Sequence, residues 1–314
     1  MRIFFATDIH GSERCFMKFV NAAKAYKVDA VVMGGDITGK LLVPLVAEPD
    51  GTFTADVFGQ VRVARDETEL AELEKTVRQS GSYTIRLPRA EKESLDGRPD
   101  AVPELFERAI EETLGRWMAV ARERLEPAGI PVFVSAGNDD EPYVEQALTD
   151  ADYVVCPEGR VTALPDGYEM VSCGWSNRTP FDSPRELTEE ELEARVSALC
   201  DGVADISRTV FNLHCPPHAT SLDSAPQLDE QLRPVVRGGS MVMTACGSTA
   251  TRSVIERYQP LLALHGHIHE SRAAQKIGKT LCMNPGSEYS EGVLRGAIVE
   301  LRKGKVKSWQ FTVG

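Results

Sequence analysis

The sequence lacks any apolar run of the length that a membrane span requires, which is about 18 consecutive residues. Hydrophobic residues make up 42% of the 314-residue chain and charged residues 26%. At the N-terminus, "MRIFFATDIHG", an aspartate and a histidine follow the short apolar stretch, so we expect a strand there and not a signal peptide. These features predict a globular protein of the cytoplasm that has no membrane partner.

Positive charge and paired cysteines are also scarce. The formal net charge is −12, which disfavours long nucleic acid as a partner, because such binding relies on Lys and Arg neutralising phosphates. The seven cysteines occur singly, without a C-x-x-C pair, which argues against a disulfide framework and against a structural zinc site. A small anionic substrate stays compatible with this charge if metal ions supply positive charge locally.

Histidine is rare, but its distribution is uneven. The chain has six histidines: five of them fall in two short clusters, at residues 214–218 and 265–269, and the sixth is His10. The stretch "LHGHIHE" at residues 264–270 places three of them on alternate positions. Such clustering favours a shared chemical role over six independent ones.

Several apolar stretches are followed directly by polar side chains. Residues 2–7, 28–33, 129–136, 209–213 and 260–264 predict strands, and a helical segment separates the first two. Asp, Asn or His follows each stretch, which is where α/β folds build their sites. A charged segment at residues 103–125 has one apolar face and predicts a helix, and the C-terminal residues predict a hairpin.

Residues 41–101 interrupt this pattern with short alternating strands and charged helical segments. We interpret them as an insertion within a single domain spanning residues 1–314. The insertion is expected to form a lid over the site or a subunit contact. Its alternating strands predict edge-to-edge pairing between two copies, and thus a homodimer.

The polar residues at the strand ends form a set of nitrogen and oxygen ligands. Carboxylates and imidazoles with one amide oxygen suit a pair of divalent ions, with manganese as the first choice and iron or zinc as alternatives. The set consists of Asp8, His10, Asp36, Asn138, His214, His267 and His269.

In order along the chain, "DIH", "GGD", "GND", "LHCPP", "GHIH" and "NPGS" resemble the motifs of the calcineurin-like metallophosphoesterases. The resemblance spans almost the whole chain except the insertion. "GGDITGK" and "HGHIHESR…NPGSEY" look most like predicted phosphoesterases related to the bacterial cyclic-nucleotide phosphodiesterase branch. The fold that this implies is an α+β four-layer αββα sandwich of two mixed sheets.

The resemblance also implies how the ligands divide between two metal ions. Asp36 would bridge the two ions and provide, with Asn138, part of the catalytic machinery. A hydroxide shared by the two ions would attack phosphorus in line. The first ion would be held by Asp8, His10, Asp36 and His269, and the second by Asp36, Asn138, His214 and His267.

One position departs from the pattern of the family. Many relatives have a histidine after the metal-binding asparagine, which helps to stabilise or protonate the leaving oxygen, but here this residue is Asp139. A carboxylate beside two cations is a poor acid at neutral pH and repels phosphate. Three interpretations stay open: Asp139 fixes the loop while the substrate needs little protonation, His218 acts as the acid, or the enzyme is slow and partly degenerate.

Other residues are predicted to lie around the metal ions. Asn177 and Arg178 lie in a loop suited to gripping a phosphate or a base, and Ser248 lies at a helix start, where it either receives an anion or simply caps the helix. His265 and Asn284 are expected to support the ligands from behind, and for His265 an ordinary packed histidine is an equal alternative.

The leading function is metal-dependent hydrolysis of phosphoester bonds, with a small nucleotide-like phosphodiester as the substrate. Branches of the family that lack the histidine include phosphodiesterases, which favours a diester over a monoester. The alternatives are a non-catalytic metal-binding scaffold of the same fold, a phosphomonoesterase and a nuclease. Arginines in "VRVAR" and "YTIRLPR" of the insertion are the feature that would support a nuclease.

Overall fold

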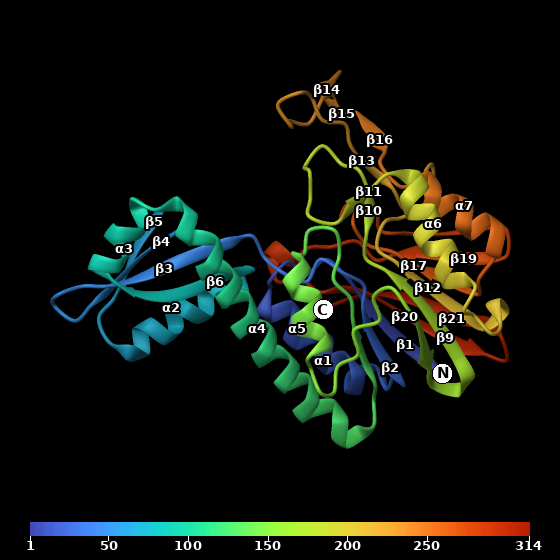
Figure 1. The fold of residues 1–314 in the computed structure, drawn as a ribbon, viewed down its shortest axis with the longest axis horizontal. Helices are drawn as coiled ribbons and strands as arrows, with labels where there is room; N and C mark the ends of the chain where they lie inside the picture. Colours follow the sequence, from blue (N-terminus) through green and yellow to red (C-terminus); the bar gives the residue numbers. More distant parts are fainter.

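The computed structural model describes residues 1–314, apart from the side chains of Asp96 and Pro99. Its main body contains two β-sheets with helices on their outer sides (Figure 1). The first sheet has the order β21-β20-β1-β2-β7. Its strands are β1 (Arg2–Ala6), β2 (Ala30–Met33), β7 (Val132–Val134), β20 (Arg295–Arg302) and β21 (Lys305–Val313). The helices that pack on it are α1 (Glu13–Tyr26), α4 (Val102–Leu125) and α5 (Pro142–Thr149).

The second sheet has the order β18-β19-β17-β12-β9-β8. Its strands are β8 (Val161–Leu164), β9 (Tyr168–Cys173), β12 (Thr209–Leu213), β17 (Leu262–Leu264), β18 (Ala273–Ile277) and β19 (Thr280–Asn284). Two helices cover its outer face, α6 (Glu189–Cys200) and α7 (Thr249–Tyr258).

Three hydrophobic cores separate the four layers. The central core joins the inner faces of both sheets, with Phe5 and Val32 from the first and Met170 and Leu264 from the second. Because the central strands are buried on both faces, they are continuous apolar runs such as "AVVM" and "LAL". This layer order confirms the predicted αββα sandwich of two mixed sheets, the architecture of the metallo-dependent phosphatase fold.

Parallel pairing brings the predicted site loops to one edge of the molecule. β2 pairs in parallel with both β1 and β7, and β12 pairs in parallel with β17. The carboxyl ends of these strands therefore point the same way within each sheet, which is where polar loops collect in such folds. The C-terminal hairpin is also confirmed: β20 and β21 are antiparallel, and Lys303 and Gly304 form the turn with positive φ.

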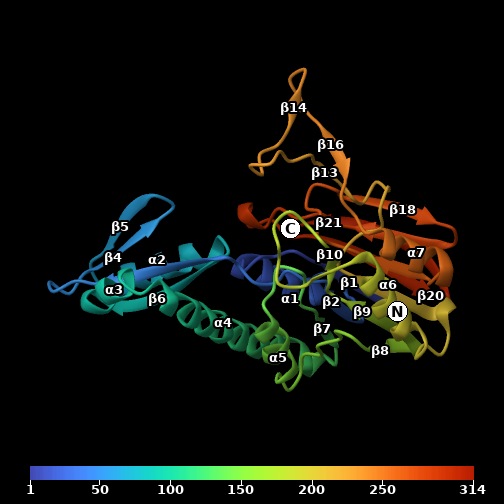
Figure 2. The ribbon, with the colours of Figure 1, turned by 45° about the horizontal axis from the view of Figure 1, so that its top comes forward.

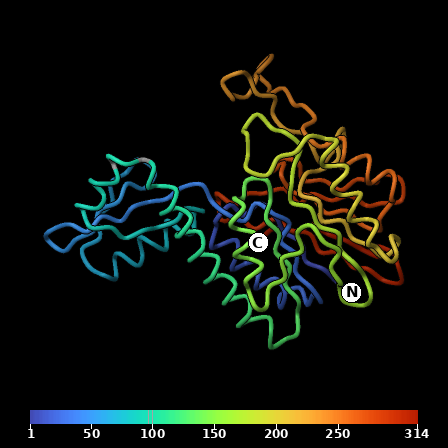
Figure 3. Tube along the Cα trace, in the orientation of Figure 1, coloured from blue at the N-terminus to red at the C-terminus, as the bar shows by residue number. Residues whose placement is uncertain are grey.

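The insertion forms a separate sheet with the order β5-β4-β3-β6, which projects from the main body in Figures 1 and 3. The predicted antiparallel strands are present, but β6 pairs in parallel with β3, which the sequence pattern did not predict. Its elements are β3 (Leu41–Ala47), β4 (Phe53–Val57), β5 (Gln60–Ala64), α2 (Glu67–Gln79), β6 (Ser82–Pro88) and α3 (Arg89–Asp96). Leu45, Leu70 and Val77 belong to its own core.

The root of the insertion packs tightly against the first site loop. A Cβ atom on Gly39 would lie 2.0 Å from the carbonyl oxygen of Gly81, and one on Gly81 would lie 2.4 Å from the carbonyl oxygen of His10. Ser12 also donates to the carbonyl of Gln79 at 3.1 Å. Only glycine permits backbones to approach so closely.

Besides the insertion, residues 224–245 form a second projecting segment, which the sequence did not predict and which extends from the main body in Figure 2. Four of its apolar side chains are exposed: Leu232, Val236, Met241 and Met243. Its strands are β13 (Ser224–Pro226), β14 (Val236–Arg237), β15 (Ser240–Met241) and β16 (Met243–Ala245). Among the described residues, no helix is both long enough and apolar enough to cross a membrane.

Candidate metal centre

All seven predicted ligands lie at the carboxyl ends of the central strands. Asp8 and His10 follow β1, and Asp36 follows β2. Asn138 follows β7, while the three remaining ligands belong to the second sheet: His214 after β12, and His267 and His269 after β17. The site is therefore assembled from both sheets.

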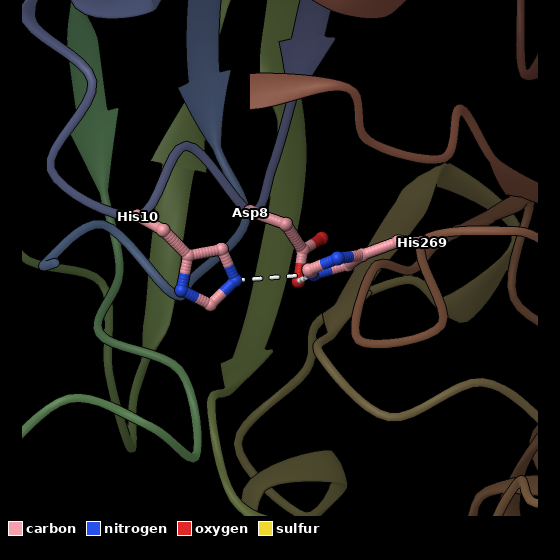
Figure 4. A group of neighbouring side chains, drawn as sticks. All are labelled: Asp8, His10 and His269. Carbon is pink, nitrogen blue, oxygen red and sulfur yellow. Dashed lines mark hydrogen bonds and ion pairs between the residues drawn. The ribbon is translucent and has the colours of Figure 1, made fainter. Parts of the chain in front are cut away.

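The first group of ligands consists of Asp8, His10 and His269 (Figure 4). The Nε2 atoms of His10 and His269 lie 3.1 Å apart, and His269 Nε2 lies 3.4 Å from Asp8 Oδ1. One ligand atom from each residue lies within 4.8 Å of the others, which is the spacing of donors around a single cation.

The second group consists of Asp36, His214 and His267. His214 Nε2 lies 3.3 Å from Asp36 Oδ2, and His267 Nδ1 lies 2.7 Å from the amide oxygen of Asn138. Asp36 also reaches the first group, since its Oδ2 lies 3.7 Å from His10 Nε2. This central position is the one that a ligand shared between two cations requires.

The orientation of His214 fits a metal ligand. Its Nδ1 lies 3.0 Å from the carbonyl oxygen of Gly34, to which it donates a hydrogen bond. Its Nε2 is buried, has no hydrogen-bond partner among the described residues, and faces the carboxylates of Asp36 and Asp8. A backbone carbonyl that fixes the imidazole tautomer is the usual support of a metal-binding histidine.

The electrostatics of the site favour cations. Burial alone would lower the pKa of His214, but the carboxylates of Asp36 and Asp8 outweigh burial and raise it to about 10. Burial lowers the pKa of His267 to about 4, and the charge of His214 adds to this effect. Burial would raise the pKa of Asp36, yet its histidine neighbours lower it overall. Two buried carboxylates that stay ionised attract positive charge strongly.

The backbone around the ligands adopts an uncommon conformation. Asp8, His10, Asp36 and His267 have φ values of 53°, 38°, 50° and 68°, in the left-handed region. Non-glycine residues rarely adopt this conformation, and it concentrates at functional sites where the surrounding structure enforces it.

Comparisons with known proteins bear on the fold. No family model matches the chain. The uncharacterized protein MJ1162 of Methanocaldococcus jannaschii is 33% identical over 122 residues, which cover 38% of this chain. The match spans about half of that protein, 49% of its length.

Solved structures match over much more of the chain. TT1561 of Thermus thermophilus has a TM-score of 0.55 at 13% identity, and the match covers 100% of this chain and 97% of that chain. YfcE, a phosphoesterase from E. coli, matches 99% of this chain and 98% of its own at 10% identity, with a TM-score of 0.33. The match to TT1561 shows that the two chains share a fold.

Asn284 supports the loop after β17 from behind. Its Nδ2 donates to the carbonyl oxygens of Gly266 at 3.1 Å and Ile268 at 3.0 Å, the two residues that flank His267. His265 is fully buried, and its Nδ1 donates to the carbonyl of Leu213 at 2.8 Å. Both residues thus hold backbone next to candidate ligands, and for His265 this contact also fits an ordinary packed histidine.

Asp140 has a supporting role that the sequence did not reveal. Its buried carboxylate accepts the backbone N–H groups of Ile37 at 3.1 Å, Thr38 at 2.9 Å and Gly137 at 2.7 Å. It therefore ties the loop after β2 to the loop after β7. Burial, together with the charge of Asp36, raises the pKa of Asp140 to about 6.

The carboxylate of Asp139 contacts two side chains, those of Lys40 and Ser183. Lys40 Nζ lies 2.6 Å from Asp139 Oδ2, and Ser183 Oγ donates to Oδ1 at 2.9 Å. Neither contact was predicted, although "GGDITGK" contains the lysine. Tyr289 was missed as well; its ring centroid lies 4.7 Å from that of His10. The ring of Tyr289 also contacts that of His269, at 5.9 Å between centroids, so this tyrosine packs against both histidines of the first ligand group.

A cavity of about 860 Å³ opens onto the ligands. Three residues predicted to lie near the substrate line it: Asn177, Arg178 and His218. The unpredicted segment 224–245 forms part of its wall, whereas no described side chain of residues 41–101 lines it. This arrangement gives no support to a lid function for the insertion.

Ser248 does not fit a substrate contact. It is fully buried, and its Oγ accepts the backbone N–H of Thr251 at 3.0 Å while donating to Glu189 at 2.6 Å. The hydroxyl is thus satisfied inside the protein as the N-cap of α7. The capping alternative accounts for Ser248, because both of its hydrogen-bonding functions are already used.

Proposed function

We propose that this chain is a metal-dependent phosphoesterase that hydrolyses a small, nucleotide-like phosphodiester. The observation that carries the proposal is the position of Asp36 between two ligand groups at the base of one cavity. When bound, a pair of divalent ions, with manganese as the first choice, would activate water and neutralise phosphate charge.

The chain itself would bind and orient the substrate. The cavity volume of about 860 Å³ lies within the range of pockets that hold small organic molecules. Arg178 and Asn177 would contact the phosphate or the group attached to it, and the exposed ring of Phe181 offers an apolar surface in the same wall. These features favour a compact ester over a long polymer.

A nuclease gains little support from the insertion. Three of the four arginines in "VRVAR" and "YTIRLPR" pair with glutamates: Arg86 with Glu67 and Glu74, Arg65 with Glu69, and Arg89 with a further glutamate. Arg62 donates to the neutral side chain of Gln60 at 2.7 Å. Arginines that are already neutralised leave little charge for a nucleic-acid backbone.

The test is hydrolysis of 4-nitrophenyl diester and monoester phosphates, after chelation and again with Mn²⁺ restored. We expect turnover of the diester that depends on metal and exceeds turnover of the monoester. Preference for the monoester would overturn the diester specificity. Bound metal without turnover of either ester would instead favour the non-catalytic scaffold.

A further inference from the structure

We infer that Lys40, anchored on Asp139, is the cationic group that contacts the leaving oxygen of the phosphoester. This inference rests on the proposed function and adds a residue to it. It also accounts for the aspartate that takes the place of a histidine beside Asn138.

The first step of the argument is the charge of Asp139. A lone carboxylate in this cavity would repel a phosphate. Lys40 Nζ lies 2.6 Å from Asp139 Oδ2, so the pair has no net charge, and one face of the ammonium group is left to the cavity. An ammonium carries three hydrogen-bond donors, of which Asp139 uses one.

The second step is the location of the pair. The Asp139 carboxylate has an oxygen within 4.8 Å of ligand atoms of both His10 and Asp36. The backbone N–H of Asp139 also donates to Asp36 Oδ1 at 3.0 Å. The carboxylate that Lys40 contacts therefore lies next to ligand atoms of both groups, and Lys40 lines the same cavity as Asp36 and His269.

The third step is the rigidity of the anchor. Asp139 is only 16% exposed and is held by Ser183 as well as by Lys40, whereas the Lys40 side chain is 61% exposed. The backbone N–H of Gly39, next to Lys40, donates to the buried hydroxyl of Tyr83 at 2.9 Å. An ordinary surface ion pair has two mobile partners and contributes little. Here the carboxylate is fixed, and the ammonium that it orients remains accessible.

The chemistry follows from this position. The ester P–O bond breaks with its electron pair on the leaving oxygen, while a new P–O bond forms to the attacking water. Of the two water protons, one ends on the leaving alcohol and the other on the phosphate product or in solvent. Lys40 donates a hydrogen bond to the leaving oxygen as its negative charge develops, and it stabilises the transition state without being consumed.

The test compares leaving groups. Methyl aryl phosphate diesters with 4-nitrophenol and with phenol as leaving groups are hydrolysed by the Mn²⁺-loaded wild type and by Lys40→Met. We expect Lys40→Met to lower kcat/KM about 100-fold for the phenyl ester but only about tenfold or less for the nitrophenyl ester, whose leaving oxygen needs little stabilisation. Lys40→Arg should recover much of the loss. Lys24→Met, an exposed lysine on α1, is the matched control and should match the wild type. An equal effect of Lys40→Met on both esters would overturn the inference.

A double-mutant cycle tests the anchor. Asp139→Asn should impair phenyl ester hydrolysis in the wild type, because it releases Lys40. In Lys40→Met it should instead raise the rate, because it removes a carboxylate that no cation compensates. An equal effect in both backgrounds would mean that Asp139 acts without Lys40, which contradicts the anchoring role.

A measurement of phosphate binding distinguishes failure of this inference from failure of the proposed function. Calorimetry with inorganic phosphate on the Mn²⁺-loaded protein should give about tenfold weaker affinity for Lys40→Met. If the wild type hydrolyses no ester, the proposed function fails, and the phosphate measurement still decides about Lys40. Unchanged phosphate affinity would overturn the inference in either case.

Discussion

The carboxylate of Asp8 accepts the backbone N–H of His267, with its two oxygens 3.0 and 3.1 Å from the nitrogen. Asp8 follows β1 in the first sheet and His267 follows β17 in the second, so this contact joins the sheets at the site. The same carboxylate would bind metal and would also fix the backbone of another ligand. The geometry of the site therefore depends on how closely the two loops approach.

Gly266→Ala should disrupt that approach. A Cβ atom at this position would lie 2.2 Å from Thr7 Oγ1 and 2.3 Å from Asp8 Oδ2. We expect the free energy of unfolding to fall by about 3 kcal/mol, as measured by urea denaturation of the metal-free protein. Gly115→Ala in helix α4 is the control, since no described atom lies within 4 Å of its added Cβ, and it should be neutral or stabilising. Equal stability of the two variants would contradict the steric argument.

Asp36→Ala should remove the ligand that both groups share. We expect fewer than two bound ions per chain by metal analysis and a loss of turnover greater than about 100-fold. Asp152→Ala, which removes a carboxylate whose side chain is 82% exposed, should retain both metal and activity. Full activity of Asp36→Ala would mean that the metal centre lies elsewhere.

Metal affinity should rise with pH. The pKa of His214 is raised to about 10, so this imidazole carries a proton at neutral pH in the metal-free protein. A metal ion must displace that proton, and the displacement becomes easier as the pH approaches the pKa from below. Calorimetry at pH 7 in two buffers of different ionisation enthalpy should detect proton release on Mn²⁺ binding. Affinity that does not change between pH 6 and 8 would contradict this assignment.

His218→Ala should leave the pH dependence of kcat/KM unchanged if Lys40 contacts the leaving oxygen. His218 lines the cavity, and its Nδ1 lies 3.7 Å from the buried carboxylate of Asp223. A general acid must be protonated, so an acidic role would make the rate fall as the pH rises through its pKa. Disappearance of such an alkaline limb in His218→Ala would restore His218 as the acid.

The clustering of the seven candidate ligands could be predicted because each follows a buried strand in a short motif, and parallel strands end at a common edge. The contact between Lys40 and Asp139 could not be predicted, since it depends on how two distant loops approach. The same limit applies to β6, whose parallel pairing with β3 is a long-range contact. Residues 224–245 lack the alternation of a strand pair, and β14 and β15 have only two residues each, so their pattern was too short to predict.

Ser248 illustrates a different limit. A serine at a helix start has one sequence signature for two roles, capping the helix and receiving an anion. In the structure, the carboxylate of Glu189 accepts a hydrogen bond from the Ser248 hydroxyl, and this contact distinguishes capping of the helix from binding of an anion.

The two glycines at the root of the insertion have a practical consequence for shortened variants. Gly81 lies against the backbone of Gly39 and of His10, so the insertion packs directly on the loop that carries His10. A chain shortened at the turn between β4 and β5 keeps this packing. A chain from which the entire segment is removed loses the packing, and the loop that carries His10 is left unsupported.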